Sequence, residues 1–485
     1  MKSKDKKRKK RKRATNKEYT IVSYFFVLIF LSLAGYMVYF NVAEKDDVIN
    51  SPYNTRQNQF QERILRGSIL SADGQVLART DTDGEGNETR VYPFANMYAH
   101  VVGYDAKGKS GIESVANFSL MTSHNDYVDQ VKNEILEKKN PGDNVVLTLN
   151  HTLQQVAYNA LGSYRGAVVV MDPQTGAVLA EVSKPDFNPN TVDSDWDTLV
   201  NENDAANSSL LNRATQGAYP PGSIFKVVDT LAYLRTHGTI DGFQYTCNGK
   251  ITVDGHTIPC FAGEVHGTED FTTAFAESCN TAFTQMGLDL GKDALTSAAE
   301  SLLFNSKLPI SLDYNKSKFD LGENPGNPLL MQTAIGQGNT LVSPMHMAMI
   351  TSAIANKGKL MEPYYMEHVE TVGGKTVEKT KPKVYKELMT EQEAEVLKNL
   401  MTEVVNRGTG TKLSGESYTA AGKTGSAEYY GADGSVKTHS WFIGFSNVED
   451  PDLAIAVIAE GAGTGSKVAV PIAHQIFNAY YYGGM

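Results

Sequence analysis

The sequence predicts a membrane-anchored α/β protein with one transmembrane helix, a small mixed α/β domain and a larger α/β domain. Three observations support this prediction. An uncharged apolar run follows a basic N-terminal tail, and two short β-type runs flank an Asp-Gly turn near residue 73. Strand-like apolar runs also lie at both ends of the region 145–485, with helical periodicity between them. The 485 residues, 41% of them hydrophobic, are enough to bury cores in two or three units.

The first forty residues have the charge pattern of a membrane anchor. Residues 1–17 contain eleven Lys and Arg and one acidic residue, and the run from Thr20 to Phe40 has 21 residues without a charge. A bilayer core needs about 20 apolar residues, whereas the core of a signal peptide has about half that number. The excess of Lys and Arg before the run predicts a cytoplasmic tail over residues 1–19 and a transmembrane helix over 20–40 that leads outward.

The rest of the chain is acidic. Without residues 1–17 it carries 34 basic and 54 acidic residues, against 45 and 55 in the whole chain. A net negative surface repels phosphate backbones, so nucleic acid is not an expected partner. The basic tail is expected to be solvated, and the apolar run that follows it is the expected contact with the cytoplasmic membrane.

A stalk and a small pedestal domain are expected over residues 41–144. The short apolar runs on either side of Asp73-Gly74 predict a β-hairpin, because an Asp-Gly pair between two such runs is a strong turn signal. The Pro-Gly-Asp sequence at 141–143 indicates a boundary. After it, the run NVVLTLN is expected to open the second domain, residues 145–485, as a strand.

The second domain is expected to have strands at its two ends. Near its start, a helix is predicted over Thr152–Leu161, followed by the strand runs GAVVVMD and AVLAEVS. Near its end, Ser440–Ser446 and Leu453–Glu460 are predicted as a strand pair, followed by a helix over Lys467–Tyr480. Uninterrupted apolar runs of this kind are typical of strands that are buried on both faces.

A serine and a lysine lie at helical spacing within GAYPPGSIFK, residues 217–226. Pro220 and Pro221 prevent a helix immediately upstream, and the apolar residues that follow have helical spacing, so a helix is expected to begin near Ser223. Residues i and i+3 share a helix face, which puts the amine of Lys226 beside the Ser223 hydroxyl. Because a desolvated lysine can take the proton of a serine, the two residues are a candidate nucleophile and base.

Two further motifs follow this pair in order. Ser278-Cys279-Asn280 begins 55 residues after Ser223, and Lys423-Thr424-Gly425 begins 200 residues after it. Each motif alone has an ordinary explanation, which is helix capping for Ser and Asn and a β-turn for Lys-Thr-Gly. Three motifs in this order are far more specific than any one of them alone.

The three motifs together resemble those of class B penicillin-binding proteins, and the resemblance extends from the N-terminal anchor nearly to the last residue. It implies a transpeptidase domain of the serine β-lactamase type, in which a five-stranded antiparallel sheet lies between helical layers. It also implies a mixed α/β pedestal of the dimerisation type. Arg66 and Glu113 lie in segments that resemble this pedestal, and they are either an ion pair within it or two unrelated surface charges.

The resemblance implies a role for each residue of the first two motifs. Ser223 attacks the carbonyl of a D-Ala–D-Ala stem peptide, and Lys226 is the base of this acylation. Lys226 must then be uncharged, through burial or through the nearby charge of Lys423. Ser278 relays a proton to the leaving amine, while Asn280 holds Lys226 and the substrate amide.

The strand with the third motif is expected to bind the substrate. Lys423 and Thr424 hold the carboxylate of the substrate, and Gly425 lets its peptide lie along an exposed strand edge. The backbone N–H groups of Ser223 and Ser426 are expected to form the oxyanion hole. No metal ligand and no cofactor are assigned to this site.

The expected function is that of a D,D-transpeptidase, which cross-links peptidoglycan stem peptides through an acyl-serine intermediate and is inhibited by β-lactams. A D,D-carboxypeptidase or a β-lactamase would use the same serine site and would differ in what deacylates the enzyme. A non-catalytic scaffold of wall synthesis is a further alternative, which the intact motifs disfavour. The resemblance also implies a polytopic membrane glycosyltransferase as a partner and an extracytoplasmic catalytic domain.

Three cysteines, Cys247, Cys260 and Cys279, lie within 33 residues around the second motif. Outside the cytoplasm cysteines tend to oxidise, and three of them permit one disulfide. One hypothesis is three unpaired thiols, and another is a Cys247–Cys260 bond across a hairpin. A Cys260–Cys279 redox switch is conceivable from the resemblance to sporulation-type relatives, and Asp254, His256, Cys260 and Cys279 would satisfy tetrahedral zinc.

Overall fold

The computed structural model of the chain describes residues 2–40, 62–201, 208–431 and 434–483. One compact unit holds the N-terminal helix α1 (Lys2–Tyr39), and a second holds all described residues from 62 onward. Within the described residues, the segment Lys17–Tyr39 is the one helical stretch that is long and apolar enough to span a membrane. It lies where the sequence predicts the transmembrane helix. The stalk expected after it falls largely outside the described residues.

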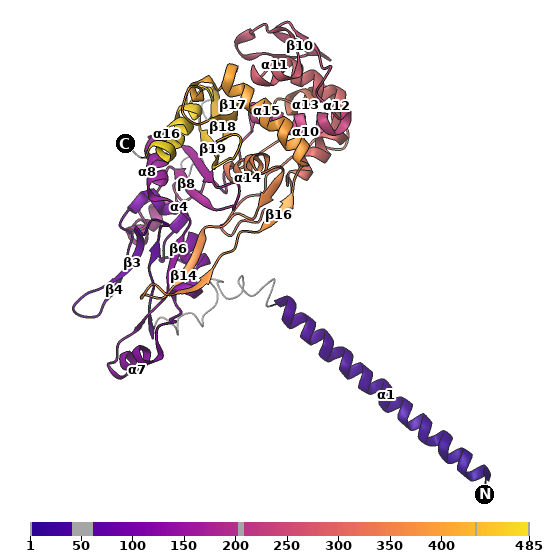
Figure 1. Cartoon of the computed structure of the whole chain (residues 1–485), viewed down its shortest axis with the longest axis vertical. Coiled ribbons are helices and arrows are strands. Elements are labelled where there is room, and N and C mark those ends of the chain that lie inside the picture. The colour runs from indigo at the N-terminus through magenta and orange to yellow at the C-terminus, as the bar shows by residue number, and fades with distance from the viewer. Residues whose placement is uncertain (1, 41–61, 202–207, 432–433, 484–485) are drawn as a thin grey trace. The chain divides into compact units, whose positions relative to one another are not determined.

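A six-stranded sheet forms the base of the second unit (Figure 1). Its strands are β2 (Ile69–Leu70), β3 (Val76–Thr82), β4 (Glu88–Val91), β6 (Asn144–Leu147), β14 (Met366–Glu370) and β15 (Thr376–Lys379). Their order is β15-β14-β6-β2-β3-β4. The predicted hairpin around the Asp-Gly turn is confirmed, since β2 and β3 pair antiparallel with Ile69 opposite Ala78.

The strand β6 lies inside this sheet, with β2 on one side and β14 on the other. The sequence analysis expects the same run to open the second domain. The position of β6 follows from its pairing with β14, a strand from a much later part of the chain. No local sequence pattern indicates this pairing. The domain division at residue 145 stays a prediction.

Short helices and strands complete this base. They are β1 (Ile64–Leu65), η2 (Ala95–Tyr98), α4 (Ala99–Val102), α5 (Gly111–Val115), α6 (Asn117–Leu120), α7 (Tyr127–Ile135) and β5 (Asn140–Pro141). β1 and β5 pair in parallel, and α4 packs against α5. The carboxylate of Glu113, on α5, is buried and pairs with the guanidinium of Arg66 at 2.6 Å, so the ion-pair alternative is the correct one.

A five-stranded antiparallel sheet forms the centre of the larger domain. Its strands are β7 (Gly166–Met171), β8 (Val178–Lys184), β17 (Ala420–Tyr430), β18 (Val436–Ser446) and β19 (Leu453–Ala459), and they run in the order β17-β18-β19-β7-β8. The first and last parts of the domain meet where β7 pairs with β19, for example at Val168 and Val457. The sheet predicted from the resemblance is therefore present.

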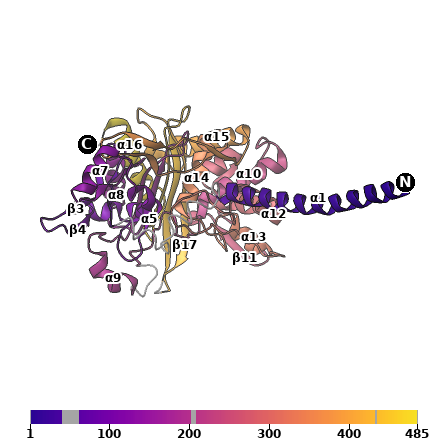
Figure 2. The ribbon, with the colours of Figure 1, turned by 90° about the horizontal axis from the view of Figure 1, so that it is seen from below.

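Helices cover both faces of this sheet (Figures 1 and 2). α8 (His151–Leu161) and α16 (Ala469–Tyr482) pack on one face, and α14 (Pro344–Ala355) packs on the other. Side chains alternate along a strand, so Val168 and Val170 join the first of these cores while Val169 and Met171 join the second. This arrangement explains why the sequence of β7 is apolar at every position.

The remaining elements form a helical region beside the sheet. They are η3 (Gly222–Phe225), α10 (Lys226–His237), α11 (Phe271–Ala276), α12 (Asn280–Ser301), α13 (Asn327–Thr333), α15 (Glu391–Arg407) and η5 (Thr411–Leu413). The helix α9 (Val192–Val200) lies apart from them, because Val192 packs with Ala99 of α4. Short strands also belong to this part of the chain, namely β9 (Tyr245–Cys247), β10 (Lys250–Val253), β11 (His256–Pro259), β12 (Gly267–Glu269), β13 (Lys359–Met361) and β16 (Val384–Glu387). The 3-10 turn η4 (Phe261–Gly263) connects β11 with β12. The helix predicted near Ser223 begins as the single 3-10 turn η3 and continues as α10.

Candidate active site

Ser223 lies in a tight turn that is held against the edge of the five-stranded sheet. Gly222 has a φ of +57° and its N–H donates to the carbonyl of Gly336 at 2.8 Å. A Cβ added at Gly336 would lie 2.0 Å from the Gly222 carbonyl oxygen, and one added at Gly222 would lie 2.9 Å from that of Ser426. The two glycines therefore permit a backbone contact that brings the Ser223 turn onto β17.

Lys226, the first residue of α10, is fully buried and faces the second motif. Its Nζ donates to the Ser278 carbonyl at 2.6 Å, to Ser278 Oγ at 3.1 Å and to Asn280 Oδ1 at 3.0 Å. Burial lowers the pKa of Lys226 to about 8, although neighbouring acidic groups and thiols act in the opposite direction. A large fraction of this amine is therefore uncharged at mildly alkaline pH.

Ser278 and Asn280 do not act as helix caps in the structure. Ser278 has a φ of +60°, which is uncommon for a residue other than glycine. The residue that precedes α12 is Cys279, whose side chain makes no capping hydrogen bond, and Asn280 Nδ2 donates to the carbonyl of Pro259 at 3.1 Å. The capping explanation of these two residues is therefore wrong, because both point their polar atoms at Lys226.

Lys423, Thr424 and Gly425 lie in the middle of β17, so the alternative of a β-turn is wrong. β17 is the outer strand of the sheet and pairs with β18 along one edge. A Cβ added at Gly425 would lie 2.9 Å from the Cβ of Trp441 and 3.0 Å from the Cγ2 of Ile224. The glycine thus lets β17 approach the turn that carries Ser223.

The side chains of Lys423 and Thr424 are both buried. Burial, and then the charge of Lys226, lower the pKa of Lys423 well below its ordinary range. The sequence analysis left open whether burial or the charge of Lys423 lowers the pKa of Lys226, and burial is the largest cause. Thr424 Oγ1 shares a hydrogen bond of 2.6 Å with Thr409 Oγ1, a neighbour that no sequence motif indicated.

The structure brings the eight predicted site residues into one region. Lys226 connects the first motif with the second, and η3 packs on β17, which carries the third. Ser426 follows the third motif on β17, and its hydroxyl accepts from the N–H of Gly465 at 3.4 Å. A segment near the C-terminus therefore also supports the site, which the spacing of the motifs did not indicate.

The cysteines lie next to the second motif but not as the sequence analysis expected. All three are described, buried and unbonded to one another, so neither proposed disulfide is present. Asp254 and His256 are exposed on the hairpin of β10 and β11, and Asp254 accepts from Asn327 Nδ2 at 2.8 Å. The zinc site with Asp254 and His256 is therefore wrong, because the turn of the hairpin carries both side chains away from the buried thiols.

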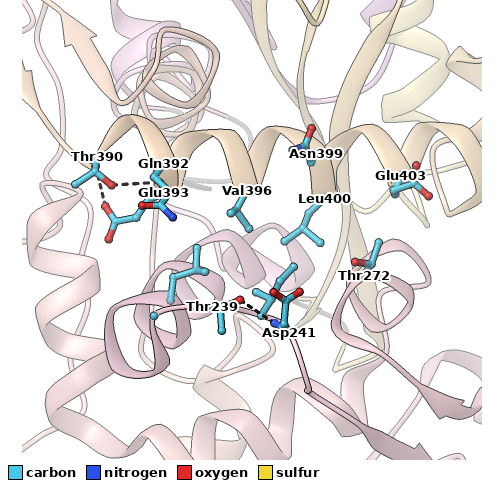
Figure 3. Close-up of a pocket in the computed structure, with 13 residues that line it drawn as sticks. Thr239, Asp241, Thr272, Thr390, Gln392, Glu393, Val396, Asn399, Leu400 and Glu403 are labelled. Carbon is cyan, nitrogen blue, oxygen red and sulfur yellow. Dashed lines mark hydrogen bonds between the residues drawn. The ribbon is translucent and has the colours of Figure 1, made fainter.

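A separate cavity of about 560 Å³ lies between the C-terminal end of α10 and the helix α15 (Figure 3). Its lining is partly apolar, with Leu234, Val396 and Leu400, and partly acidic, with Asp241 and Glu403. None of the eight predicted site residues lines it. The chemistry of the three motifs therefore does not belong to this cavity.

Comparisons with known proteins agree with the geometry of the site. Residues 166–478 match the penicillin binding protein transpeptidase domain, and residues 66–145 match the penicillin binding protein A dimerisation domain. The chain is 32% identical over 476 residues to the peptidoglycan D,D-transpeptidase PbpA of Mycolicibacterium smegmatis, covering 92% of this chain and 95% of the relative. It is 30% identical over 417 residues to stage V sporulation protein D of Bacillus subtilis, covering 80% of this chain and 63% of the relative.

Solved structures give the same result. The imipenem acyl-enzyme complex of penicillin-binding protein A from M. tuberculosis has a TM-score of 0.78 and 30% identity, with 87% of this chain and 99% of that chain covered. The D,D-transpeptidase domain of a peptidoglycan glycosyltransferase from Eggerthella lenta has a TM-score of 0.76 and 30% identity, with 87% and 99% covered. This chain therefore belongs to the class B penicillin-binding proteins.

Proposed function

We propose that the protein is a serine D,D-transpeptidase that cross-links the stem peptides of peptidoglycan and is acylated by β-lactams. The main observation behind this proposal is the buried amine of Lys226, which donates hydrogen bonds to Ser278 and Asn280. Lys226 itself follows directly after the 3-10 turn that contains Ser223. Relatives named peptidoglycan D,D-transpeptidase and similar structures with β-lactam acyl-enzymes support the same activity.

In the proposed acylation, Ser223 Oγ attacks the carbonyl carbon of the penultimate D-Ala while its proton passes to the amine of Lys226. The tetrahedral intermediate then expels the terminal D-Ala, and the proton reaches the leaving amine through Ser278 Oγ. An ester between Ser223 and the stem peptide remains. The amine of a second stem peptide attacks this ester, which forms the cross-link and releases the serine.

The backbone of the site is suited to the charge that develops in this reaction. The N–H groups of Ser223 and Ser426 are proposed to hold the oxyanion, since the Ser223 turn and β17 are in backbone contact. Loss of one such donor typically slows a reaction by about 10² to 10³. Preorganised donors are effective because they need no reorientation as the charge forms.

The substrate peptide is proposed to lie along the outer edge of β17, since the strand is at the end of the sheet order. Lys423 and Thr424 then hold the carboxylate of the terminal D-Ala. In the free enzyme, burial and the charge of Lys226 disfavour a charged Lys423. Arrival of a carboxylate supplies the opposite charge and favours the ammonium form, which couples substrate binding to protonation.

The proposed location is the outer side of the cytoplasmic membrane. The candidate spanning helix Lys17–Tyr39, the one found among the described residues, follows a tail rich in Lys and Arg, and such tails stay in the cytoplasm. The second unit would then face the peptidoglycan. A polytopic membrane glycosyltransferase is the proposed partner, because cross-linking by a transpeptidase domain acts on glycan strands that a glycosyltransferase polymerises.

The activity is tested by incubating the purified protein with a synthetic D-Ala–D-Ala stem peptide and an acceptor amine. A transpeptidase forms the acyl-acceptor product, whereas a carboxypeptidase releases D-Ala and the free acid even with acceptor present. Turnover of a chromogenic β-lactam would identify a β-lactamase. A protein that forms none of these products and takes no fluorescent penicillin would be a scaffold, and the proposal would fail.

A further inference from the structure

We propose that Cys247, Cys260, His266 and Cys279 form a structural zinc site that fastens the Ser-Cys-Asn motif to the neighbouring strand region. The four potential ligand atoms lie within 4.8 Å of one another. Three thiolates and one imidazole make a closed tetrahedral zinc site of a common structural type. The metal binding is independent of the proposed activity.

The distances between the ligand atoms fit one tetrahedral ion. The Sγ atoms of Cys247 and Cys260 are 3.6 Å apart, and those of Cys260 and Cys279 are 3.8 Å apart. Cys247 Sγ lies 3.3 Å from Nδ1 of His266. Zn–S bonds of about 2.3 Å at tetrahedral angles place two sulfurs about 3.8 Å apart, and a sulfur and a nitrogen about 3.6 Å apart. A disulfide would instead need about 2.0 Å between two sulfurs and would leave the third unused.

The surroundings of the four groups also suit a metal. The three cysteines are between 0% and 2% exposed, so their sulfurs are shielded from solvent and oxidants. The N–H of Gly249 donates to Cys247 Sγ at 3.4 Å, and Thr281 Oγ1 lies 3.4 Å from Cys279 Sγ. Such donors stabilise thiolates, which are the form that binds zinc.

His266 is oriented as a zinc ligand would be. Its Nδ1 points at the sulfur of Cys247, and its Nε2 lies 3.8 Å from the carboxylate of Glu264. A histidine that binds a metal through one ring nitrogen usually presents the other to a carboxylate or a carbonyl, which fixes the orientation of the ring. The sequence analysis missed His266 because it follows Cys260 by six residues and shares no strand with it.

The segment that carries these ligands consists of short strands that pack against the helices α11, α12 and α13. The strands around them form two separate two-stranded sheets, β10 with β11 and β9 with β12. Many residues of this segment are exposed, and a two-stranded sheet contributes little stability of its own in water. Natural small modules of this kind gain stability from a disulfide or a metal, and no disulfide joins the cysteines of this chain.

The site has a consequence for catalysis, and this part rests on the proposed function. Cys279 lies between Ser278 and Asn280, which both accept hydrogen bonds from Lys226. Ser278 has the positive φ of +60°, a conformation that its surroundings must maintain. A Zn–S bond to Cys279 would anchor the chain between the two residues, so zinc would act on their position without contacting the substrate.

The test starts with metal analysis of the full chain, purified in detergent under reducing conditions without chelator. We expect about one zinc per chain, and Co²⁺ in its place should give the visible bands and sulfur-to-cobalt absorption of a tetrahedral thiolate site. Cys247→Ser and His266→Ala should each lose the metal. His256→Ala is the matched control and should retain it, since His256 is an exposed histidine of the same segment.

The metal proposal is overturned if the wild-type chain holds no zinc and takes up no Co²⁺, or if mass spectrometry of the unreduced protein finds two cysteines joined. It is also overturned if His256→Ala loses the metal while His266→Ala keeps it. The cobalt spectrum of the wild type needs no variant, so misfolding of a variant does not obscure the result.

The effect on the site is measured by the rate of fluorescent-penicillin labelling before and after chelation, and after zinc is added back. We expect chelation to slow labelling by at least about tenfold and zinc to restore it, as for other groups that orient active-site residues. Unchanged labelling in a zinc-free protein would overturn the positioning role. A protein that binds zinc but is never labelled would leave the metal site intact and reject the proposed function.

Discussion

At the scale of single residues, the proposed acylation depends on Ser223, and replacing this residue is the most direct test. Ser223→Ala should abolish covalent labelling by fluorescent penicillin, because no hydroxyl remains to form the ester. Ser414→Ala is a suitable control, since Ser414 is exposed after η5 and lies outside the three motifs. Labelling gels run beside circular dichroism spectra of both variants provide the measurement. Normal labelling of a folded Ser223→Ala protein would reject the nucleophile.

A second prediction at this scale concerns the pH dependence of acylation. Lys226 acts as a base only when its amine is uncharged, and burial lowers its pKa to about 8. The uncharged fraction therefore rises with pH, so the acylation rate should increase about tenfold per pH unit below pH 8 and level off above it. Stopped-flow labelling between about pH 6 and 9.5 measures the profile. A rate that falls or stays constant across this interval would contradict the assignment of Lys226 as the base.

At the scale of elements, the turn before α10 is defined by backbone contact and not by side chains. Gly336 and Gly338 both have a φ of +72°, but they differ in their neighbours. A Cβ at Gly336 would lie 2.0 Å from the Gly222 carbonyl oxygen, whereas one at Gly338 would meet the end of the flexible Leu329 side chain at 3.1 Å. Gly336 therefore fixes the position of the Ser223 turn.

The two glycines give a matched pair of variants. Gly336→Ala should destabilise the fold by about 1–3 kcal/mol more than Gly338→Ala, because the clash is with backbone. It should also slow penicillin acylation more strongly, since relief of the clash moves Gly222 and with it Ser223. Urea unfolding and labelling rates measure the two effects. Equal effects of the two substitutions would mean that the positive φ alone, and not the contact, is responsible.

The short helix α5 is joined to neighbouring segments by a buried cluster of charged side chains around Glu113. Arg66 donates to Glu113 through Nε at 2.7 Å, and Arg90 donates to the other carboxylate oxygen at 2.7 Å. Burial raises the pKa of Glu113, but the two guanidinium groups more than offset burial and hold it below the ordinary value. The carboxylate is therefore charged at neutral pH and compensates both buried cations.

Removal of this carboxylate should destabilise the protein strongly. Glu113→Ala removes the carboxylate that two buried guanidinium groups share, and the loss of one partner of a buried ion pair typically costs about 3–5 kcal/mol. Asp81→Ala is the control, since the Arg79–Asp81 pair has side chains that are 43% and 50% exposed and should contribute less than about 1 kcal/mol. The free energy of unfolding in urea distinguishes them. A similar small loss for both would show that the cluster is not needed for stability.

At the scale of the whole molecule, the chain separates into the helix α1 and the unit that carries all three motifs. A chain without residues 1–45 should stay in solution without detergent and be labelled by penicillin at the rate of the full chain. The reason is that the three motifs and α1 belong to separate compact units, and the apolar stretch Lys17–Tyr39 is the part that would need a membrane or detergent. Sedimentation and labelling rates check this prediction, and loss of labelling in the folded shorter protein would contradict it.

The sequence by itself determined the family and the local elements. Three ordered motifs contain the proposed site residues, among them Ser223, Lys226 and Lys423, and spacing along the chain is enough to find these motifs. Helices and strands such as α8 and β7 follow from apolar periodicity, which depends on neighbours in the sequence. The candidate membrane span is a local property of the same kind.

Only the tertiary structure decided contacts between distant segments. The sequence left Arg66 and Glu113 open as a pair and placed β6 without its partner β14. It offered Asp254 and His256 as possible zinc ligands beside the cysteines and did not indicate His266. Each of these outcomes depends on how loops close and strands pair over tens to hundreds of residues, and side-chain spacing along the chain contains little information about such closure. Lys226 depends on both levels of structure. Its motif is recognised in the local sequence, whereas its low pKa results from burial in the folded protein.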